Sequence, residues 1–342
     1  MDLRRLVLAA AFLSVGGGGE TLIFAPEKDA RMVRVWSEGL RLGLDSLEMT
    51  LDGNEVGVSF EEVVFVQRRG FELTDVVAAA TPDRLLEFER AYDTGELTFE
   101  LEVDGATMAS ASGAHACAES RVRFAYDAEK EEYARELVDG ALDPERLAGL
   151  GVALDLVGLL PEEEVEQGDT WRVDPELLRE FFAAGGELGF APGALTAAGL
   201  GVPNEVVLAG TFGSLHELFL PGSELAGKAE VKFEGVEEGL ARLVLALELD
   251  VKAALDEKYA SFALDGGDTS GRTLDVAAEL EGELVVLWDS AANHLRSAKF
   301  RGELALESEL AFPFRMQPDA DPLDFEGSYE LSGEVEAELA IR

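Results

Sequence analysis

Apolar and polar residues alternate with a period of two along much of the chain. The alternation is clearest in Leu40–Leu44, in residues 96–103 (ELTFELEV) and in residues 121–126 (RVRFAY). Because successive side chains of a strand point to opposite faces, this pattern predicts antiparallel strands with one buried and one hydrated face. Polar turns separate the strands, among them Asp52-Gly53-Asn54 and the charged stretch 127–131.

The alternating segments become longer toward the C-terminus. Strands are expected at residues 229–234, 240–251, 272–288, 294–310 and 324–341. Long strands joined by short charged turns predict an antiparallel meander. Four glycines fall inside these strands: Gly282, Gly302, Gly327 and Gly333. Glycine within a strand indicates a bend or a bulge, so the sheet should be strongly curved.

Helices are expected to be few and short. Asp143-Pro144 and Asp174-Pro175 each place an aspartate at the N-cap and a proline at the first helical position. The second pair opens PELLREFFAAGG, in which Gly185-Gly186 is a stop signal. The predicted fold class is therefore mainly β, a β-rich α+β protein with curved antiparallel sheets or half-barrels and two or three short helices.

Residues 1–19 have the layout of a secretory signal peptide followed by a glycine linker. Arg4-Arg5 precede the apolar run 6–13, which is too short for a membrane anchor, and Ser14 and Gly16 supply small residues for cleavage. A buried first strand or helix is the alternative. The pattern predicts a bacterial protein exported to the periplasm or the cell exterior, with no transmembrane segment in the mature chain. The remainder divides into an N-terminal β-rich half (20–160) and a C-terminal β-meander half (161–342).

The composition narrows the classes of partner. The formal net charge is −41, and a surface this acidic repels phosphate backbones, so nucleic-acid binding is disfavoured. The charge either keeps a β-rich protein soluble or reflects a salt-rich habitat. Hydrophobic residues make up 47% of the chain, enough for a core. The single cysteine, Cys117, cannot form an internal disulfide.

The acidic run at 161–171 (PEEEVEQGDTW) invites a catalytic interpretation. Glycosidic chemistry needs two carboxylates in a cleft, one with a raised pKa, and a run in a polar loop supplies neither burial nor opposed geometry. A solvated loop is therefore preferred. Structural roles are assigned instead: Gly168 and Asp169 turn the chain, Trp171 enters the core, and Asp174 and Pro175 begin a helix.

Metal and thiol chemistry receive little support. Asp265, Asp268 and Ser270 have the oxygen ligands and neighbouring glycines of a calcium loop, which is kept as a minor alternative. His115 and Cys117 lie two residues apart in SASGAHACAES and could form an activated thiolate pair. The small residues around them favour a flexible hairpin loop. We expect no catalytic residue and no cofactor.

One segment resembles a known group of proteins. Residues 159–171 (LLPEEEVEQGDTW) resemble the LP-x-V-x-x-GD-[ST]-W signature of a group of uncharacterised exported bacterial proteins. Those proteins are β-rich and carry a domain of unknown function. The hairpins at 233–247 and 287–305 fill the places of that group's glycine-containing turn motifs, although the turn glycine is missing at 290–293. The resemblance covers roughly residues 90–342. It implies export and β-sheet architecture and carries over no catalytic residue.

These patterns together predict a non-enzymatic envelope protein. Curved sheets with a helix over the open face can enclose an apolar pocket, and the helix at 175–184 is the expected cover. The expected partner is a lipid or other apolar ligand, or an envelope protein; periplasmic lipoprotein carriers are the architectural analogy. One alternative is a structural or assembly protein that uses a sheet face or edge for contact. A hydrolase with an unrecognised site is a weaker alternative.

Overall fold

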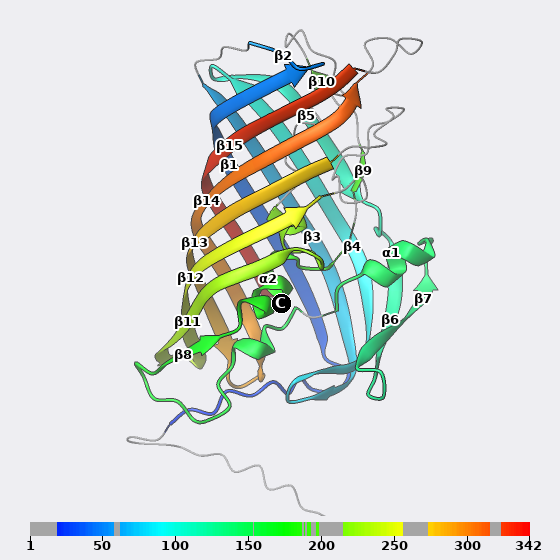
Figure 1. Cartoon of the computed structure of the whole chain (residues 1–342). Helices are drawn as coiled ribbons and strands as arrows, with labels where there is room; N and C mark the ends of the chain where they lie inside the picture. Colours follow the sequence, from blue (N-terminus) through cyan, green and yellow to red (C-terminus); the bar gives the residue numbers. More distant parts are fainter. Residues whose placement is uncertain are drawn as a thin grey trace, which may run out of the picture.

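The fold is built on one large antiparallel sheet (Figure 1). The computed structural model describes residues 19–57, 62–152, 154–186, 188, 190–192, 196–197, 215–255, 273–314 and 323–342. Fifteen strands of these residues join the sheet, in the order β10-β5-β4-β3-β1-β15-β14-β13-β12-β11-β8, with β2, β6, β7 and β9 paired alongside. The predicted fold class, mainly β with strong curvature, is confirmed.

The strands of the N-terminal half are β1 (Arg31–Leu51), β2 (Asn54–Glu55), β3 (Val63–Thr81), β4 (Arg84–Val103), β5 (Ala106–His115), β6 (Ser120–Asp127) and β7 (Glu132–Asp139). Those of the C-terminal half are β8 (Thr170–Val173), β9 (Phe190–Pro192), β10 (Thr196–Ala197), β11 (Glu224–Glu237), β12 (Leu240–Ala254), β13 (Thr273–Asp289), β14 (His294–Phe314) and β15 (Leu323–Ile341). The described helices are α1 (Pro144–Gly149), α2 (Arg179–Phe182) and α4 (Leu215–Leu218), with 3₁₀ turns η1 (Val157–Leu159) and η2 (Pro175–Leu178).

The turns predicted at 52–54 and 127–131 are confirmed, whereas one loop prediction fails. SASGAHACAES is predicted as a flexible loop, and this is wrong for its first half. Residues 106–115 form strand β5, and only 116–119 form a turn. Pairing with β4 on one side and with β9 and β10 on the other supplies the backbone hydrogen bonds, so small side chains do not prevent a strand here.

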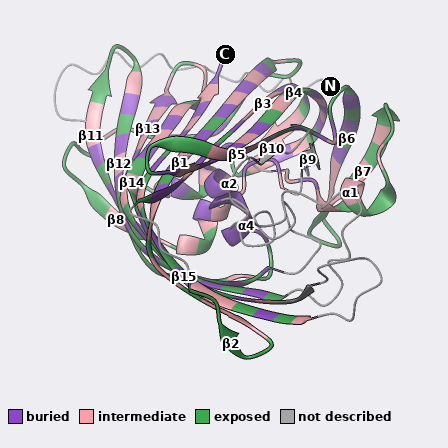
Figure 2. Ribbon diagram, turned by 90° about the horizontal axis from the view of Figure 1, so that it is seen from above, coloured by how far each residue is buried: buried purple, intermediate pink, exposed green. Residues whose placement is uncertain are grey.

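Both halves of the sequence contribute to the same sheet. β1 pairs with β15 along nearly its whole length, from Arg34 opposite Ile341 to Leu51 opposite Phe325. This pairing joins the first long strand to the last. Between β7 and β11 the chain enters the concave side of the sheet, where α2 and α4 lie inside its curve (Figure 2). Residue 160 therefore divides the sequence without dividing the sheet.

An aromatic cluster fixes α2 against the concave face. Phe181 meets Trp36 of β1 edge-on at 4.9 Å between ring centroids, and Phe182 meets Phe300 of β14 in the same way at 5.1 Å. Phe219, just after α4, stacks on Phe182 at 4.5 Å. All five rings are buried, so the cluster excludes water from the part of the concave face that it covers.

Two glycines make room for this cluster. Gly282 of β13 lies directly opposite Gly302 of β14, and the Phe300 ring covers both. A Cβ atom at either glycine would overlap a backbone carbonyl oxygen of the neighbouring strand as well as the Phe300 ring. An aromatic ring over strand glycines replaces the packing that the missing side chains would give. The sequence predicts a bend or a bulge here, but the register of β13 and β14 has no shift at this pair, and the two glycines instead allow a close approach of strands under a ring.

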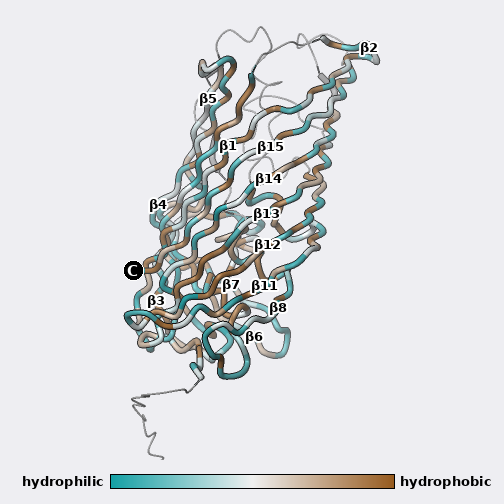
Figure 3. The backbone as a smooth tube through the Cα atoms, turned by 90° about the vertical axis from the view of Figure 1, so that its left-hand side faces the viewer, coloured by the Kyte–Doolittle hydropathy of each residue, from teal (hydrophilic) through white to brown (hydrophobic). Residues whose placement is uncertain are grey.

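The convex face is acidic and exposed. Hydrophilic and hydrophobic residues alternate along the long strands, as Figure 3 shows, and the hydrophilic set points outward. One outward row crosses four adjacent strands as Glu248, Glu281, Glu303 and Glu334, each directly opposite the next. Cations end the row at each side: Lys228 bonds Glu248 at 2.7 Å, and Arg41 lies opposite Glu334. Like charges directly across a sheet repel, so this row weakens the fold at low ionic strength.

Glu281→Lys should therefore stabilise the protein. The new cation would stand between Glu248 and Glu303, and we expect a melting temperature about 2–4 °C higher at low salt. In 1 M salt, where screening extends only about 3 Å, the gain should vanish. The matched control is Glu283→Lys on the same strand and face, which would oppose Arg301 and should lower the melting temperature. Equal shifts for the two variants in thermal melts would contradict this explanation.

Candidate functional site

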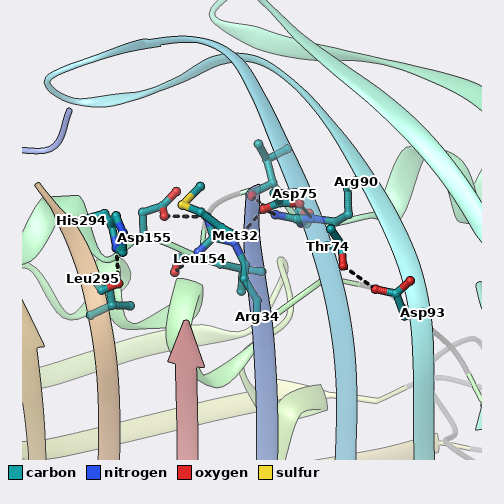
Figure 4. Close-up of polar contacts among 12 residues, drawn as sticks. Met32, Arg34, Thr74, Asp75, Arg90, Asp93, Leu154, Asp155, His294 and Leu295 are labelled. Atoms are coloured by element: carbon teal, nitrogen blue, oxygen red, sulfur yellow. Dashed lines mark hydrogen bonds and ion pairs between the residues drawn. The ribbon is translucent and has the colours of Figure 1, made fainter. Parts of the chain in front are cut away.

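A buried ionic network crosses the concave face near one end of the sheet (Figure 4). Asp75 of β3 accepts hydrogen bonds from Arg34 of β1 at 2.6 Å and from Arg90 of β4 at 2.7 and 2.8 Å. Arg34 also bonds Asp155, in the segment before η1, at 2.7 Å. The side chains of Arg34, Asp75 and Arg90 are fully buried. This arrangement gives each buried charge a partner, which its burial requires.

The network also binds backbone of the segment inside the curve. Arg90 donates to the carbonyls of Gly151 and Val152 at 2.8 and 3.1 Å, and Arg34 donates to that of Leu154 at 3.1 Å. Burial alone would raise the pKa of Asp75, but Arg90 and Arg34 outweigh it and hold that pKa below its ordinary value. The carboxylate therefore stays ionised, and the network acts as a clamp between three strands and the interior segment.

A second group of charged and polar side chains, here named the polar cluster, lies further along the same face. Its members are Glu38 of β1, Arg69 of β3, His115 of β5, and His216 and Glu217 of α4. Glu38 and Arg69 stand directly opposite one another in the strand register. All five are buried, with exposed fractions of 2–6%. Arg69 acts electrostatically on the other four, so it is the centre of the cluster.

Burial dominates the electrostatics of the polar cluster. It raises the pKa of Glu38 to about 7, against an opposing effect of Arg69. It lowers the pKa of Arg69 to about 10, and it lowers the pKa values of His115 and His216. Buried groups with displaced pKa values on a concave face are typical of functional sites. The histidines are then neutral near pH 7, each with one donor and one acceptor nitrogen.

The raised pKa of Glu38 makes a definite prediction for stability. The folded chain holds a proton on Glu38 up to about pH 7, whereas an unfolded glutamate releases it near 4.5, so this residue costs stability as pH rises through that window. Glu38→Gln should remove the cost. We expect its unfolding free energy, relative to that of the wild type, to rise by roughly 2–3 kcal/mol between pH 5 and pH 8.

Urea titrations of both proteins across that pH range measure the difference. Taking the difference cancels the contributions of His115, His216 and Glu180 of α2, whose pKa burial also raises to about 7, because both proteins retain these residues. Glu330→Gln on the convex face controls for the loss of one carboxylate. A relative stability of Glu38→Gln that stays constant with pH would show that Glu38 does not titrate as assigned.

Beyond the polar cluster the concave face becomes apolar. This apolar stripe carries buried or half-buried side chains of four strands: Leu44, Leu47, Met49, Leu51, Leu274, Val276, Leu306, Leu310, Phe325 and Leu331. α2 does not lie over the stripe, since it lies nearer the opposite end of the long strands (Figure 1), and α4 contacts β12, which is outside the four strands of the stripe. The described concave face thus has a helix-covered aromatic part, the polar cluster, and then the apolar stripe.

The convex face carries two adjoining grooves of about 600 and 350 Å³. Outward-facing residues make up most of their lining, and Asp275, Glu309 and Ser328 line both. Lys252 is the single cation that contributes to either lining. An acidic, open groove does not suit an apolar ligand, so the concave face is the better candidate site.

The residues given structural roles occupy one continuous stretch at the edge of the sheet. Gly168 has a positive φ of 99°, and Asp169 accepts a hydrogen bond from the Glu166 amide at 2.8 Å. Trp171 lies in β8, half-buried against the core, and its Nε1 donates to the Leu159 carbonyl at 3.1 Å. Asp174 caps η2 by accepting from the Glu176 amide at 3.0 Å, with Pro175 at the first helical position.

His115 and Cys117 do not form the activated thiolate pair, although His115 belongs to the polar cluster. His115 and Cys117 are both buried, and burial raises the pKa of the Cys117 thiol to about 11, which opposes formation of a thiolate. Asp265, Asp268 and Ser270 lie outside the described residues. Elsewhere in the described ranges, no three acidic, histidine or cysteine side chains lie close enough to hold a metal ion. Among the described helices, none has the length and apolar composition needed to cross a bilayer.

Sequence reasoning missed the two buried polar groups. The sequence held a signal for part of them. Arg34 and Glu38 alternate with Trp36 and Leu40 on the inward face of β1, so two charged residues occupy positions where apolar residues are expected. Comparison with protein-family models finds no match to the chain, and comparison with curated proteins finds no similar sequence. Function is therefore inferred from the geometry of the concave face alone.

Proposed function

We propose that the protein is a non-enzymatic, exported binding protein that holds an apolar ligand along the concave face of its sheet. One observation carries the proposal: the apolar stripe continues past the helices, so the inward apolar face is longer than its described helical cover. Leu44, Leu47, Met49 and Leu51 of this stripe are only half-buried, and a bound acyl chain would cover them.

The clamp around Asp75 does not supply a hydrolytic residue. Asp75 is fixed by two arginines through three hydrogen bonds, which makes it a structural anion. A hydrolase needs a carboxylate or nucleophile that can reach substrate and exchange protons, and the clamp leaves Asp75 no such freedom. The clamp is therefore structural, and a hydrolytic role would have to come from the polar cluster, where burial raises the pKa of Glu38 to about 7.

The first described residues are consistent with removal of a signal peptide. Glu20 and Val165 exchange two backbone hydrogen bonds of 2.8 and 3.0 Å, and Leu22 and Phe24 are buried. Phe24 packs against Trp288, whose Nε1 donates to the Ile23 carbonyl at 3.2 Å. Cleavage near Gly16 would therefore leave every one of these contacts in place, which supports export as part of the proposal.

Binding of the neutral fluorescent dye N-phenyl-1-naphthylamine tests the proposal. We expect dye fluorescence to rise on binding. Met49→Glu, which places a charge in the apolar stripe, should weaken binding at least about tenfold because a carboxylate is costly to bury. Thr50→Glu is the matched control, since it adds the same charge one residue along β1 on the opposite face.

Two outcomes would contradict the proposal. The first is no dye binding by the folded wild-type protein. The second is equal loss of binding in the two variants with unchanged folding, because the concave face would then have no special role. Either result would favour the alternative of an assembly protein that meets its partner through a sheet edge or the acidic convex face.

A further inference from the structure

Glu38 stands at the boundary between two environments. On the same face of β1, Trp36 precedes it and packs against α2, whereas Leu40 follows it and leads to the apolar stripe. Arg69 lies opposite Glu38 on β3. On the inward face of β3, its neighbours are Phe71, opposite Trp36, and Gln67, opposite Leu40. A ligand tail on the stripe would thus bring its polar end to this cluster.

The Glu38 carboxylate has an unfilled hydrogen-bonding capacity. Its side chain is 4% exposed, and neither carboxylate oxygen has a hydrogen-bond partner in the part of the chain that the structure describes. Its electrostatic partner is Arg69, which does not lie within hydrogen-bonding distance of it. Buried polar atoms in native proteins nearly always have partners, so two orphaned acceptors point to a donor supplied from outside the chain.

The charge of the cluster restricts that donor. Above about pH 7, where Glu38 is ionised, Glu38 and Glu217 stand against one cation among the described members of the cluster, Arg69, and both histidines are neutral. A phosphate or carboxylate head would add a third anion to a buried site, which is costly. A hydroxyl-bearing head has no charge to desolvate and donates the hydrogen bonds that the carboxylate accepts.

We propose that the polar cluster is the head-group site for a neutral amphiphile of the acylglycerol class, whose hydroxyl groups donate to Glu38 while its acyl tail lies on the apolar stripe. This inference rests on the proposed function and specifies its ligand.

Competition against the bound dye by three probes with one acyl chain, measured well above the Glu38 pKa of about 7 so that its carboxylate is ionised, tests the head-group site. Monooleoylglycerol has hydroxyl donors, methyl oleate has none, and oleate is anionic. Wild-type protein should bind monooleoylglycerol at least about tenfold more tightly than methyl oleate, because hydrogen bonds to a charged acceptor are among the stronger ones and a tenfold change corresponds to about 1.4 kcal/mol. Oleate should bind most weakly.

Glu38→Leu, which removes both acceptors, should abolish the preference for monooleoylglycerol. Its affinity for methyl oleate should stay within about twofold of the wild-type value, which also shows that the variant is folded. Glu38→Gln keeps one acceptor and should give an intermediate preference.

The outcomes separate the two proposals. If all three probes bind wild-type protein equally, or if Glu38→Leu keeps the full preference, the head-group site is wrong while an apolar binding protein remains. If oleate binds best, the site recognises an anion and the acylglycerol class is wrong. If neither dye nor any probe binds folded wild-type protein, the proposed function itself fails.

Discussion

Asp75→Ala is expected to lower the free energy of unfolding by about 4 kcal/mol. The change removes the carboxylate that bonds both Arg34 and Arg90, so the buried Arg90 guanidinium loses this ion pair while Arg34 keeps Asp155. Breaking a buried ion pair by removing one partner typically costs 3–5 kcal/mol because the other charge stays uncompensated. Chemical denaturation at pH 7 measures the loss.

Two comparisons make this result specific. Glu248→Ala removes one partner of an exposed pair, Lys228–Glu248, and its effect should be far smaller because exposed pairs contribute little. Acid should also weaken the wild type through Asp75. The pKa of Asp75 in the folded protein lies below the ordinary value for aspartate. Asp75 therefore contributes its full stabilisation at pH values above the ordinary pKa, and this stabilisation is lost as the pH falls through the folded-state pKa. If Asp75→Ala melted like the wild type, the clamp would not hold the interior segment.

Gly302→Ala is the second substitution with a large expected effect, a loss of about 3 kcal/mol or more. The new methyl group would overlap the Glu281 carbonyl oxygen and the Phe300 ring, and the backbone oxygen can move away only if the strand shifts. Overpacking of this kind costs typically 1–3 kcal/mol, and here the lost contact of Phe300 with Phe182 adds to it.

Gly39→Ala provides the matched control. Gly39 lies within β1, and a Cβ atom there would meet nothing within 4 Å. The same change at Gly39 should be neutral or slightly stabilising, because alanine restricts the unfolded chain more than glycine does. Similar melting temperatures for the two alanine variants would show that the close approach of β13 and β14 is not required.

The sequence predicts the C-terminal meander well because each of its strands has one wet and one buried face. β12, for example, alternates buried and exposed positions over nearly its whole length. β3 and the first part of β4 do not alternate cleanly. Val63, Val64 and Val66 are all buried, so both faces of β3 carry apolar residues, and register shifts between β3 and β4 interrupt the period of two. Periodicity therefore could not identify these strands.

The candidate site was less accessible to sequence reasoning. The clamp joins residues that lie 41 and 121 positions apart, and no local spacing announces such a contact. Arg34 and Glu38 could have been identified because they lie at inward positions of an alternating strand. Their partners Asp75 and Arg69 can be identified only once the register of β1 and β3 is known. The acidic run 161–171 attracted attention through composition, whereas the buried charges that matter are single residues in apolar surroundings.

Native mass spectrometry tests the central claim most directly. The full chain would be produced in a bacterium, allowed to export, purified without detergent, and measured before and after solvent extraction. We expect one neutral acyl lipid per folded chain, which solvent extraction removes. The fraction of chains that carry this lipid should be lower for Met49→Glu and unchanged for Thr50→Glu. A folded protein whose mass equals that of its polypeptide alone, and whose solvent extract contains no lipid, would contradict it.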